Sequence, residues 1–182
     1  MKEAHRRLRE ATAHAHEAVD AAFGGYDLTD RDSYVRFLSA HAEVMVPLEA
    51  ALDAAGAERV APDWGMRKRG ELILADLAAL DARPPAVRNE PIKLGRNGSE
   101  DLLSTLAGVL YVVEGSRLGG KFLARRVPAD FPKSYLDAHQ PSGNWAKLLA
   151  SIDQILYDQR RTETAIDAAL ATFVLFERAG RN

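Results

Sequence analysis

The feature that most restricts the fold of this chain is a helical repeat of apolar residues that runs through nearly all of it. Apolar side chains recur every three or four residues, and no stretch alternates between polar and apolar residues as a strand does. Breaks fall at Gly24 and Gly25, in a connection rich in proline and glycine over residues 81–100, and in a loop over 128–143. We therefore expect an all-α protein.

The bounds of the expected helices follow from these breaks and from capping residues. The second helix should begin at the Thr29–Asp30 cap and continue to about Ala55, with Pro47 kinking or splitting it. The other helices are expected before Gly24 and over residues 64–80, 99–127 (capped by Ser99 or Glu100), 144–157 and 162–178.

Length and composition predict a single domain over residues 1–182. A chain of 182 residues can bury a sizeable core. It has 24 basic and 26 acidic residues, a net charge of −2, so no strong field favours nucleic acid or a membrane surface. The absence of cysteine excludes disulfides and thiolate metal sites. We find neither a secretory signal nor an apolar run long enough to cross a bilayer, and we expect a cytoplasmic protein.

The first helix carries a histidine at the edge of its apolar face. That face comprises Leu8, Ala11, Thr12, Ala15, Val19 and Phe23. At about 100° per residue, His16 lies roughly 60° from the middle of this face and His14 roughly 140° from it. We therefore expect His16 to turn inward and His14 to face solvent. His5 lies on the same side as His16, but so near the chain start that its turn is expected to fray.

His16 has two interpretations. It can be an ordinary histidine at the core edge of an amphipathic helix. It can also coordinate a metal, because Asp20, one turn later, is placed to accept a hydrogen bond from the other ring nitrogen. Arg9, on the same side two turns earlier, could meet a carboxylate of a bound ligand.

A second informative stretch, residues 108–126, contains four glycines within an expected helix: Gly108, Gly115, Gly119 and Gly120. Each glycine costs a helix about 1 kcal/mol relative to alanine, so the group needs a reason. The first three share one face with Tyr111. A bare face permits either close helix packing or a flat ligand against the backbone, and adjacent glycines also permit a bend. Interleaved polar side chains (Ser116, Arg117 and Lys121) favour the ligand.

At these two stretches the sequence resembles the haem oxygenase family. The pattern L-R-x-x-T-x-x-x-H-x-x-x-D spans Leu8 to Asp20, and Y-V-V-E-G-S-R-L-G-G spans Tyr111 to Gly120. Residues 26–53 are similar to the second and third family helices, and residues 169–179 to the closing helix. The resemblance is to the bacterial branch, which includes enzymes found beside bacterial phytochromes.

The resemblance implies a helical bundle with haem sandwiched between the first helix and a kinked, glycine-rich distal helix. It implies an enzyme that uses dioxygen and external electrons to cleave haem, its cofactor and substrate, to biliverdin, carbon monoxide and ferrous iron. By the same resemblance His16 is the axial iron ligand. Asp20 occupies the position at which the family usually has a glutamate that orients this ligand. Because aspartate is shorter than glutamate, the contact is expected to need an intervening water. The other implied site residues are Arg9, Tyr111 and the more loosely aligned Lys147 at the haem propionates, Gly115, Gly119 and Gly120 on the distal helix, and Phe173 and Phe176 in the pocket wall.

Catalysis is expected at Gly115, Ser116 and Gly119, where bare backbone and ordered water take the place of a distal histidine. Mammalian members carry an aspartate directly after the first distal glycine to anchor the water, whereas this chain, like bacterial relatives, has Ser116. That departure leaves the proton route open, and it keeps a non-catalytic haem carrier or sensor as the alternative. Di-iron oxidases of similar architecture are disfavoured, because the chain has no E-x-x-H pair. A purely structural bundle leaves the glycine face unexplained.

Electrons must come from another protein, because the chain has no flavin or nicotinamide motif. Arg117, Lys121, Arg125 and Arg126 form a basic stripe on the distal helix. This stripe suits docking of an acidic ferredoxin or a reductase, and equally an ordinary solvated face. The bacterial branch also suggests supply of biliverdin to a bacterial phytochrome.

Overall fold

The computed structural model describes residues 3–86, 92, 94 and 101–182, and over these residues the chain is helical with no strand. The expected all-α class is confirmed. The elements are α1 (Glu3–Phe23), α2 (Arg31–Ala55), the short 3₁₀ turns η1 (Ala57–Arg59) and η2 (Trp64–Met66), α3 (Gly70–Ala79), α4 (Leu102–Ala124), α5 (Asn144–Ile155) and α6 (Gln159–Gly180).

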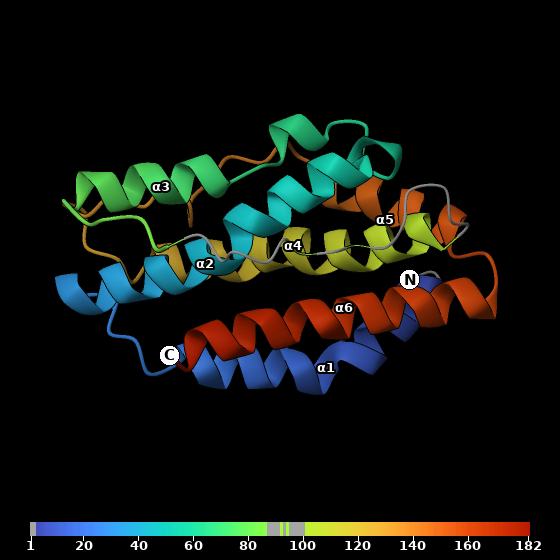
Figure 1. The fold of residues 1–182 in the computed structure, drawn as a ribbon, viewed down its shortest axis with the longest axis horizontal. Helices are drawn as coiled ribbons and strands as arrows, with labels where there is room; N and C mark the ends of the chain where they lie inside the picture. Colours follow the sequence, from blue (N-terminus) through green and yellow to red (C-terminus); the bar gives the residue numbers. More distant parts are fainter. Residues whose placement is uncertain (1–2, 87–91, 93, 95–100) are drawn as a thin grey trace.

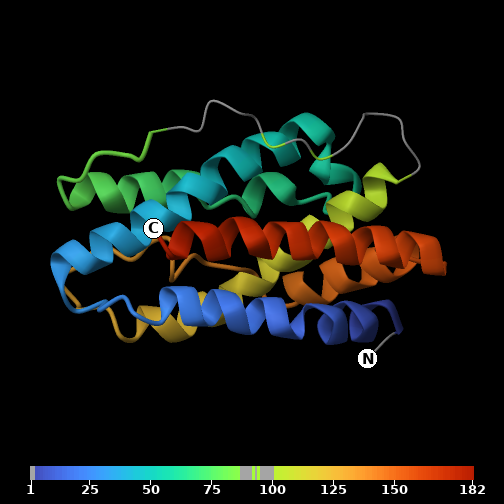
Figure 2. The same cartoon turned by 60° about the horizontal axis from the view of Figure 1, so that its bottom comes forward.

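Helix α6 packs against most of the other long helices. It packs extensively along both α1 and α4 and also contacts α2, while α5 lies against α4 and α1. Figures 1 and 2 both show α6 running beside α1. Buried side chains such as Leu8, Leu38, Leu110 and Phe173 join α1, α2, α4 and α6 in one core. None of the described helices has the length and apolar character needed to span a membrane.

Helix α2 begins where the sequence predicts. The Asp30 carboxylate accepts a hydrogen bond from the Ser33 backbone N–H at 2.8 Å, and the helix ends at Gly56, which has a φ of 77°. Pro47 lies inside α2, and the helix continues past it to Ala55, so of the two predicted outcomes, a kink or a split, the split does not occur.

The start of α3 is a correction to the expected helix over 64–80. The chain makes only one 3₁₀ turn at Trp64–Met66, and α3 begins at Gly70. The buried Glu49 carboxylate of α2 accepts hydrogen bonds from the Arg69 and Gly70 backbone N–H groups at 2.6 and 2.9 Å. A carboxylate from a different helix therefore caps α3, which local capping signals cannot indicate.

The remaining boundaries differ by a few residues from expectation. Helix α4 ends at Ala124, and its predicted cap at Ser99 or Glu100 lies outside the described residues. Helix α6 begins at Gln159 because the Asp158 side chain accepts from the Arg161 N–H at 2.8 Å.

Candidate functional site

Helix α1 buries a narrower face than expected. Ala4, Leu8 and Thr12 are buried, and the Thr12 hydroxyl donates to the Leu8 carbonyl at 2.8 Å. Toward its C-terminal end the helix buries less, because Val19 is only partly covered. Ala11 is exposed, so its predicted place on the buried face is wrong.

His16 lies beside α6 but is not buried. Its side chain is 63 % exposed, so the expectation of an inward imidazole is wrong as regards burial. The ring makes an edge contact with Phe173 of α6, with 6.0 Å between centroids. Its Nδ1 atom is 3.1 Å from Asp20 Oδ2, a direct contact that needs no intervening water. Because Asp20 engages Nδ1, Nε2 is the ring nitrogen left to coordinate a metal. His14 is exposed, as predicted.

The four glycines of α4 have different surroundings. A Cβ at Gly108 would lie 2.0 Å from the Ala165 carbonyl oxygen, and one at Gly120 would lie 3.2 Å from the Leu136 carbonyl oxygen. These two glycines permit close backbone packing, so the structure corrects the inclusion of Gly108 on the open face and the assignment of Gly120 to a ligand.

Gly115 and Gly119 lie on a face that other backbone does not cover. A Cβ at Gly115 would meet only the Trp145 side chain, at 3.5 Å, and one at Gly119 would meet nothing within 4 Å. Leu118 and Phe122, three residues after each glycine, are 64 % and 65 % exposed. We call the surface at Gly115 and Gly119, which the exposed side chains of Leu118 and Phe122 border, the glycine face. Exposed apolar side chains beside bare backbone mark a surface that binds a ligand or a partner. Neither Leu118 nor Phe122 was predicted as a site residue, although the helical spacing places both beside these glycines.

An aromatic cluster joins α1, α4 and α5 at one end of this face. The Tyr111 ring lies 5.7 Å from Trp145 and 6.1 Å from His5, measured between centroids. Burial raises the pKa of the Tyr111 phenol, and hydrogen bonding to the Thr12 side chain acts in the opposite direction. Burial also lowers the pKa of His5, which lies within α1 rather than in a frayed turn. Trp145 was not predicted from the sequence as a site residue.

The two phenylalanines of α6 that were expected in the pocket wall are both buried next to a histidine. Phe173 is buried beside His16, and Phe176 is buried with its ring 6.1 Å from that of His41. His41 Nδ1 lies 2.9 Å from the Phe37 carbonyl oxygen and donates a hydrogen bond to it, since a carbonyl only accepts, so Nδ1 carries the proton. Burial lowers the pKa of His41 to about 4, with the Arg69 charge acting in the same direction.

Ser116 and Arg117 are held by buried side chains. The Ser116 hydroxyl donates to the Val113 carbonyl and accepts from Arg69, both at 2.7 Å. Arg117 is only 4 % exposed and pairs with Glu114 at 2.9 Å. Arg117 therefore does not belong to a surface stripe, which is a correction. Lys121, Arg125 and Arg126 are exposed as predicted.

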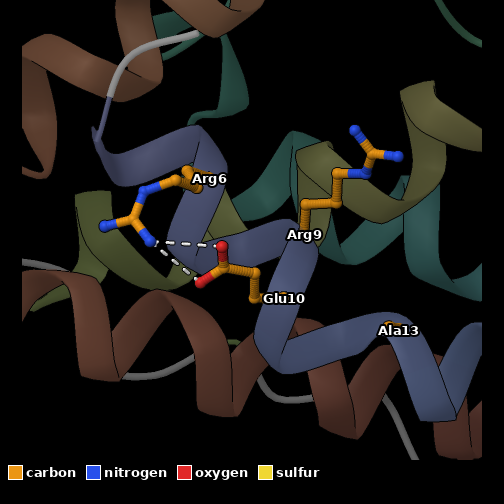
Figure 3. A pocket seen from close by; sticks show the side chains of 4 residues that line it. All are labelled: Arg6, Arg9, Glu10 and Ala13. Carbon is orange, nitrogen blue, oxygen red and sulfur yellow. Dashed lines mark hydrogen bonds and ion pairs between the residues drawn. The ribbon is translucent and has the colours of Figure 1, made fainter.

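Two expected propionate contacts lie on other helices, Arg9 on α1 and Lys147 on α5. Arg9 is exposed and lines a hollow of about 240 Å³ with Arg6, Glu10 and Ala13. In Figure 3 its side chain extends away from the 3.1 Å pair between Arg6 and Glu10. Within the described part of the chain, Arg9 makes no ion pair.

Lys147 is exposed in the first turns of α5. Hydrogen bonding to Arg67 lowers the pKa of Asp63, and the positive charge of Lys147 acts in the same direction. Lys147 thus interacts electrostatically with the Asp63 carboxylate, in the segment between α2 and α3.

The structure brings one set of predicted residues together and leaves others separate. His16, Asp20 and Phe173 form one group between α1 and α6, and Tyr111 with the glycine face forms a second group on α4. The described residues contain no cluster of three or more His, Asp or Glu side chains that could hold a metal.

Comparison with known proteins identifies the family of this chain. The sequence matches the haem oxygenase family over residues 2–181. It is 27 % identical over 158 residues to a haem oxygenase of Xanthomonas campestris pv. campestris, covering 81 % of this chain and 88 % of the relative. It is 25 % identical over 181 residues to the haem oxygenase PigA of Pseudomonas aeruginosa, covering 93 % of this chain and 87 % of the relative.

The fold is similar to that of the haem oxygenase of Neisseria meningitidis, solved with NO and with CO bound. The TM-score is 0.81 at 20 % identity, and the match covers 97 % of this chain and 89 % of the other. The match over almost the whole sequence shows that this chain belongs to the haem oxygenase family.

Proposed function

We propose that this protein is a haem oxygenase, which uses dioxygen and external electrons to cleave haem to biliverdin, carbon monoxide and ferrous iron. The observation that carries the proposal is the open glycine face of α4, on which a Cβ at Gly119 would meet nothing within 4 Å. Gly108 packs against the backbone of α6 at Ala165, whereas Gly119 faces open space. In a member of this family, an open glycine surface fits a flat macrocycle better than a neighbouring helix.

The residues present fit haem. His16 has Nε2 available, since Asp20 engages Nδ1, and Phe173 supplies an apolar ring beside it. Leu118 and Phe122 supply exposed apolar surface on α4. Haem, when bound, supplies the iron that binds dioxygen and the porphyrin ring that is oxidised.

We assign the polar edge of the macrocycle to Tyr111 and Arg9, with Lys147 as a third candidate. Burial keeps the Tyr111 phenol protonated, because it raises the pKa, and a protonated phenol can donate a hydrogen bond to a carboxylate. Arg9 has no ion pair among the described residues, so its guanidinium is available to a propionate. Phe176 extends the apolar wall behind Phe173.

Ser116 acts in this proposal as a positioned acceptor beside Gly115. Its own proton is donated to the Val113 carbonyl while Arg69 donates to its oxygen. The serine oxygen can therefore accept one further hydrogen bond from a water, and it cannot donate one without losing its bond to Val113. Protons would then reach the site through water rather than from an acidic side chain at this position.

The electron donor is proposed to be a ferredoxin or a reductase with an acidic surface. Lys121, Arg125 and Arg126 are exposed near the C-terminal end of α4, and opposite charges steer such encounters. We also propose a cytoplasmic location and supply of biliverdin to a bacterial phytochrome, on the resemblance to the bacterial branch.

A haem carrier or sensor is the second candidate, and the engaged proton of Ser116 is the observation that favours it. One experiment separates the two. The protein is titrated with haemin, then supplied with reductant under air, and the absorbance of the haem band is followed. An enzyme converts this band to a bilin spectrum, and chromatography identifies the product. A carrier binds haemin and keeps the band.

A further inference from the structure

The buried face of α4, opposite the glycine face, carries an ion-pair cluster that the reaction itself does not use. Glu114 has no exposed side-chain surface, and its Oε2 accepts from Arg67 at 2.8 Å and from Gln140 at 3.1 Å. Its Oε1 accepts from Arg117 at 2.9 Å. Arg117 also donates to the Arg67 backbone carbonyl, which closes the group.

Further hydrogen bonds of Arg67 and Arg69 hold the same turn of α4. Arg67 bonds further to Asp63 at 2.7 Å and to the Asn144 carbonyl at 3.1 Å. Arg69 donates to the Val113 carbonyl at 2.7 Å. Side chains from the segment before α3 and from the loop before α5 therefore converge on residues 113–117, the turn that contains Gly115, and the Asn144 carbonyl of α5 holds one of them, Arg67.

The angular position of this cluster around α4 shows how it bears on the rotation of the helix about its axis. At about 100° per residue, Glu114 lies roughly 120° and Arg117 roughly 180° from the midpoint between Gly115 and Gly119. The bare face is narrow, because Phe122 lies roughly 40° and Leu118 roughly 80° to one side of its middle, and Ser116 lies roughly 80° to the other side. A rotation of α4 by roughly 60° would therefore present the Leu118 side chain where the bare backbone of Gly115 now lies.

We propose that Glu114 is a positioning residue that fixes the rotation of α4, so that Gly115 and Gly119 rather than Leu118 face the macrocycle. The inference rests on the proposed haem site. A buried carboxylate that pairs with two buried guanidinium groups resists rotation strongly, since turning away leaves charges unpaired in the interior. Helix propensity does not fix the rotation of α4 about its axis. The glycines cannot fix it either, because they have no side chains to make contacts.

The test compares Glu114→Gln with Asp101→Asn, the same acid-to-amide change at the other end of α4. Asp101 pairs with Arg160 at 2.8 Å on the surface, so its loss should leave the turn at 113–117 in place. The readout is the C–O stretching band of carbon monoxide bound to the reduced haem complex, which responds to the groups above the iron. We expect this band to shift or split in Glu114→Gln and to stay at the wild-type position in Asp101→Asn. Turnover should fall by roughly 100-fold in Glu114→Gln.

Gln140→Ala provides a milder variant, because it removes one donor to Glu114 and leaves every charge in place. If Glu114→Gln does not fold, a shifted band in Gln140→Ala supports the proposal and an unshifted band overturns it. An unchanged band in folded Glu114→Gln, or an equal shift in Asp101→Asn, also overturns it. A wild-type protein that binds no haem contradicts the proposed function itself, which distinguishes that failure from a failure of the positioning role.

Discussion

Nδ1 of His16 lies 3.1 Å from Oδ2 of Asp20, one helical turn further along α1. This contact directs Nε2, rather than Nδ1, toward any metal that the histidine binds. Both residues are exposed, so the pair adds little to stability. Its consequence is the orientation of one ring, and that orientation can be tested directly.

Replacing His16 with alanine should abolish the absorption spectrum of a haem bound by one imidazole. His14→Ala is the matched control, since His14 is also exposed and lies two residues away on a different side of α1. Titration with haemin, followed by absorption and electron paramagnetic resonance spectra, checks both variants. Equal spectra from the two would show that His16 is not the ligand.

Replacing Asp20 with alanine should weaken haem binding without removing the imidazole signature. Loss of a group that orients a ligating histidine commonly lowers metal affinity by about tenfold or more. Glu17→Ala removes another exposed acid of the same helix and should leave affinity unchanged. Haemin dissociation rates, measured by transfer to an acceptor protein, report the difference; identical rates in Asp20→Ala and wild type would exclude the orienting role.

Two glycine substitutions in α4 should have opposite effects. Gly108→Ala places a methyl group 2.0 Å from the Ala165 carbonyl oxygen and should lower the free energy of unfolding by about 3 kcal/mol. Gly119→Leu enters open space in the haem-free protein, where it should keep or raise stability by up to about 1 kcal/mol. Haem affinity should nevertheless fall in Gly119→Leu. Urea unfolding and haemin titration measure the two effects, and tight haemin binding by Gly119→Leu would contradict the open-face assignment.

His41 should make stability depend on pH. Burial holds its pKa at about 4 in the folded protein, below the ordinary value of 6.5. The unfolded chain therefore takes up a proton first as the pH falls. Stability from the neutral ring is complete above pH 6.5 and is lost progressively toward pH 4, by about 3 kcal/mol.

His41→Phe removes this titration and keeps an aromatic ring next to Phe23 and Phe37. Urea unfolding at a series of pH values should give a flatter profile for the variant than for wild type between pH 6.5 and 4. Parallel profiles would assign the acid sensitivity to other groups.

Reversing the exposed charges Lys121, Arg125 and Arg126 to glutamate should slow turnover driven by an acidic ferredoxin by about tenfold at low salt. Turnover driven by a chemical reductant should not change. Arg36→Glu, an exposed reversal on α2, is the control. Equal loss with both reductants would place the defect in the site rather than in docking.

The sequence was sufficient for the helical class and for the pairing of His16 with Asp20, because both depend on spacing within one helix. It also placed Gly115 and Gly119 together with Tyr111, by the same periodicity. It failed for Gly108 and Gly120, since their neighbours Ala165 and Leu136 come from distant segments. It failed again for α3, whose first backbone donors are satisfied by Glu49 of α2.

Periodicity thus determined which side chains share a face, since a helix repeats at a known angle along its own sequence. The tertiary structure alone decided what lies opposite each face. It turned Arg117 from an expected surface cation into a buried partner of Glu114, and it left Leu118 and Phe122 exposed beside the glycines. The physical reason is that burial and charge pairing depend on contacts between segments far apart in the chain, and no local pattern records those contacts.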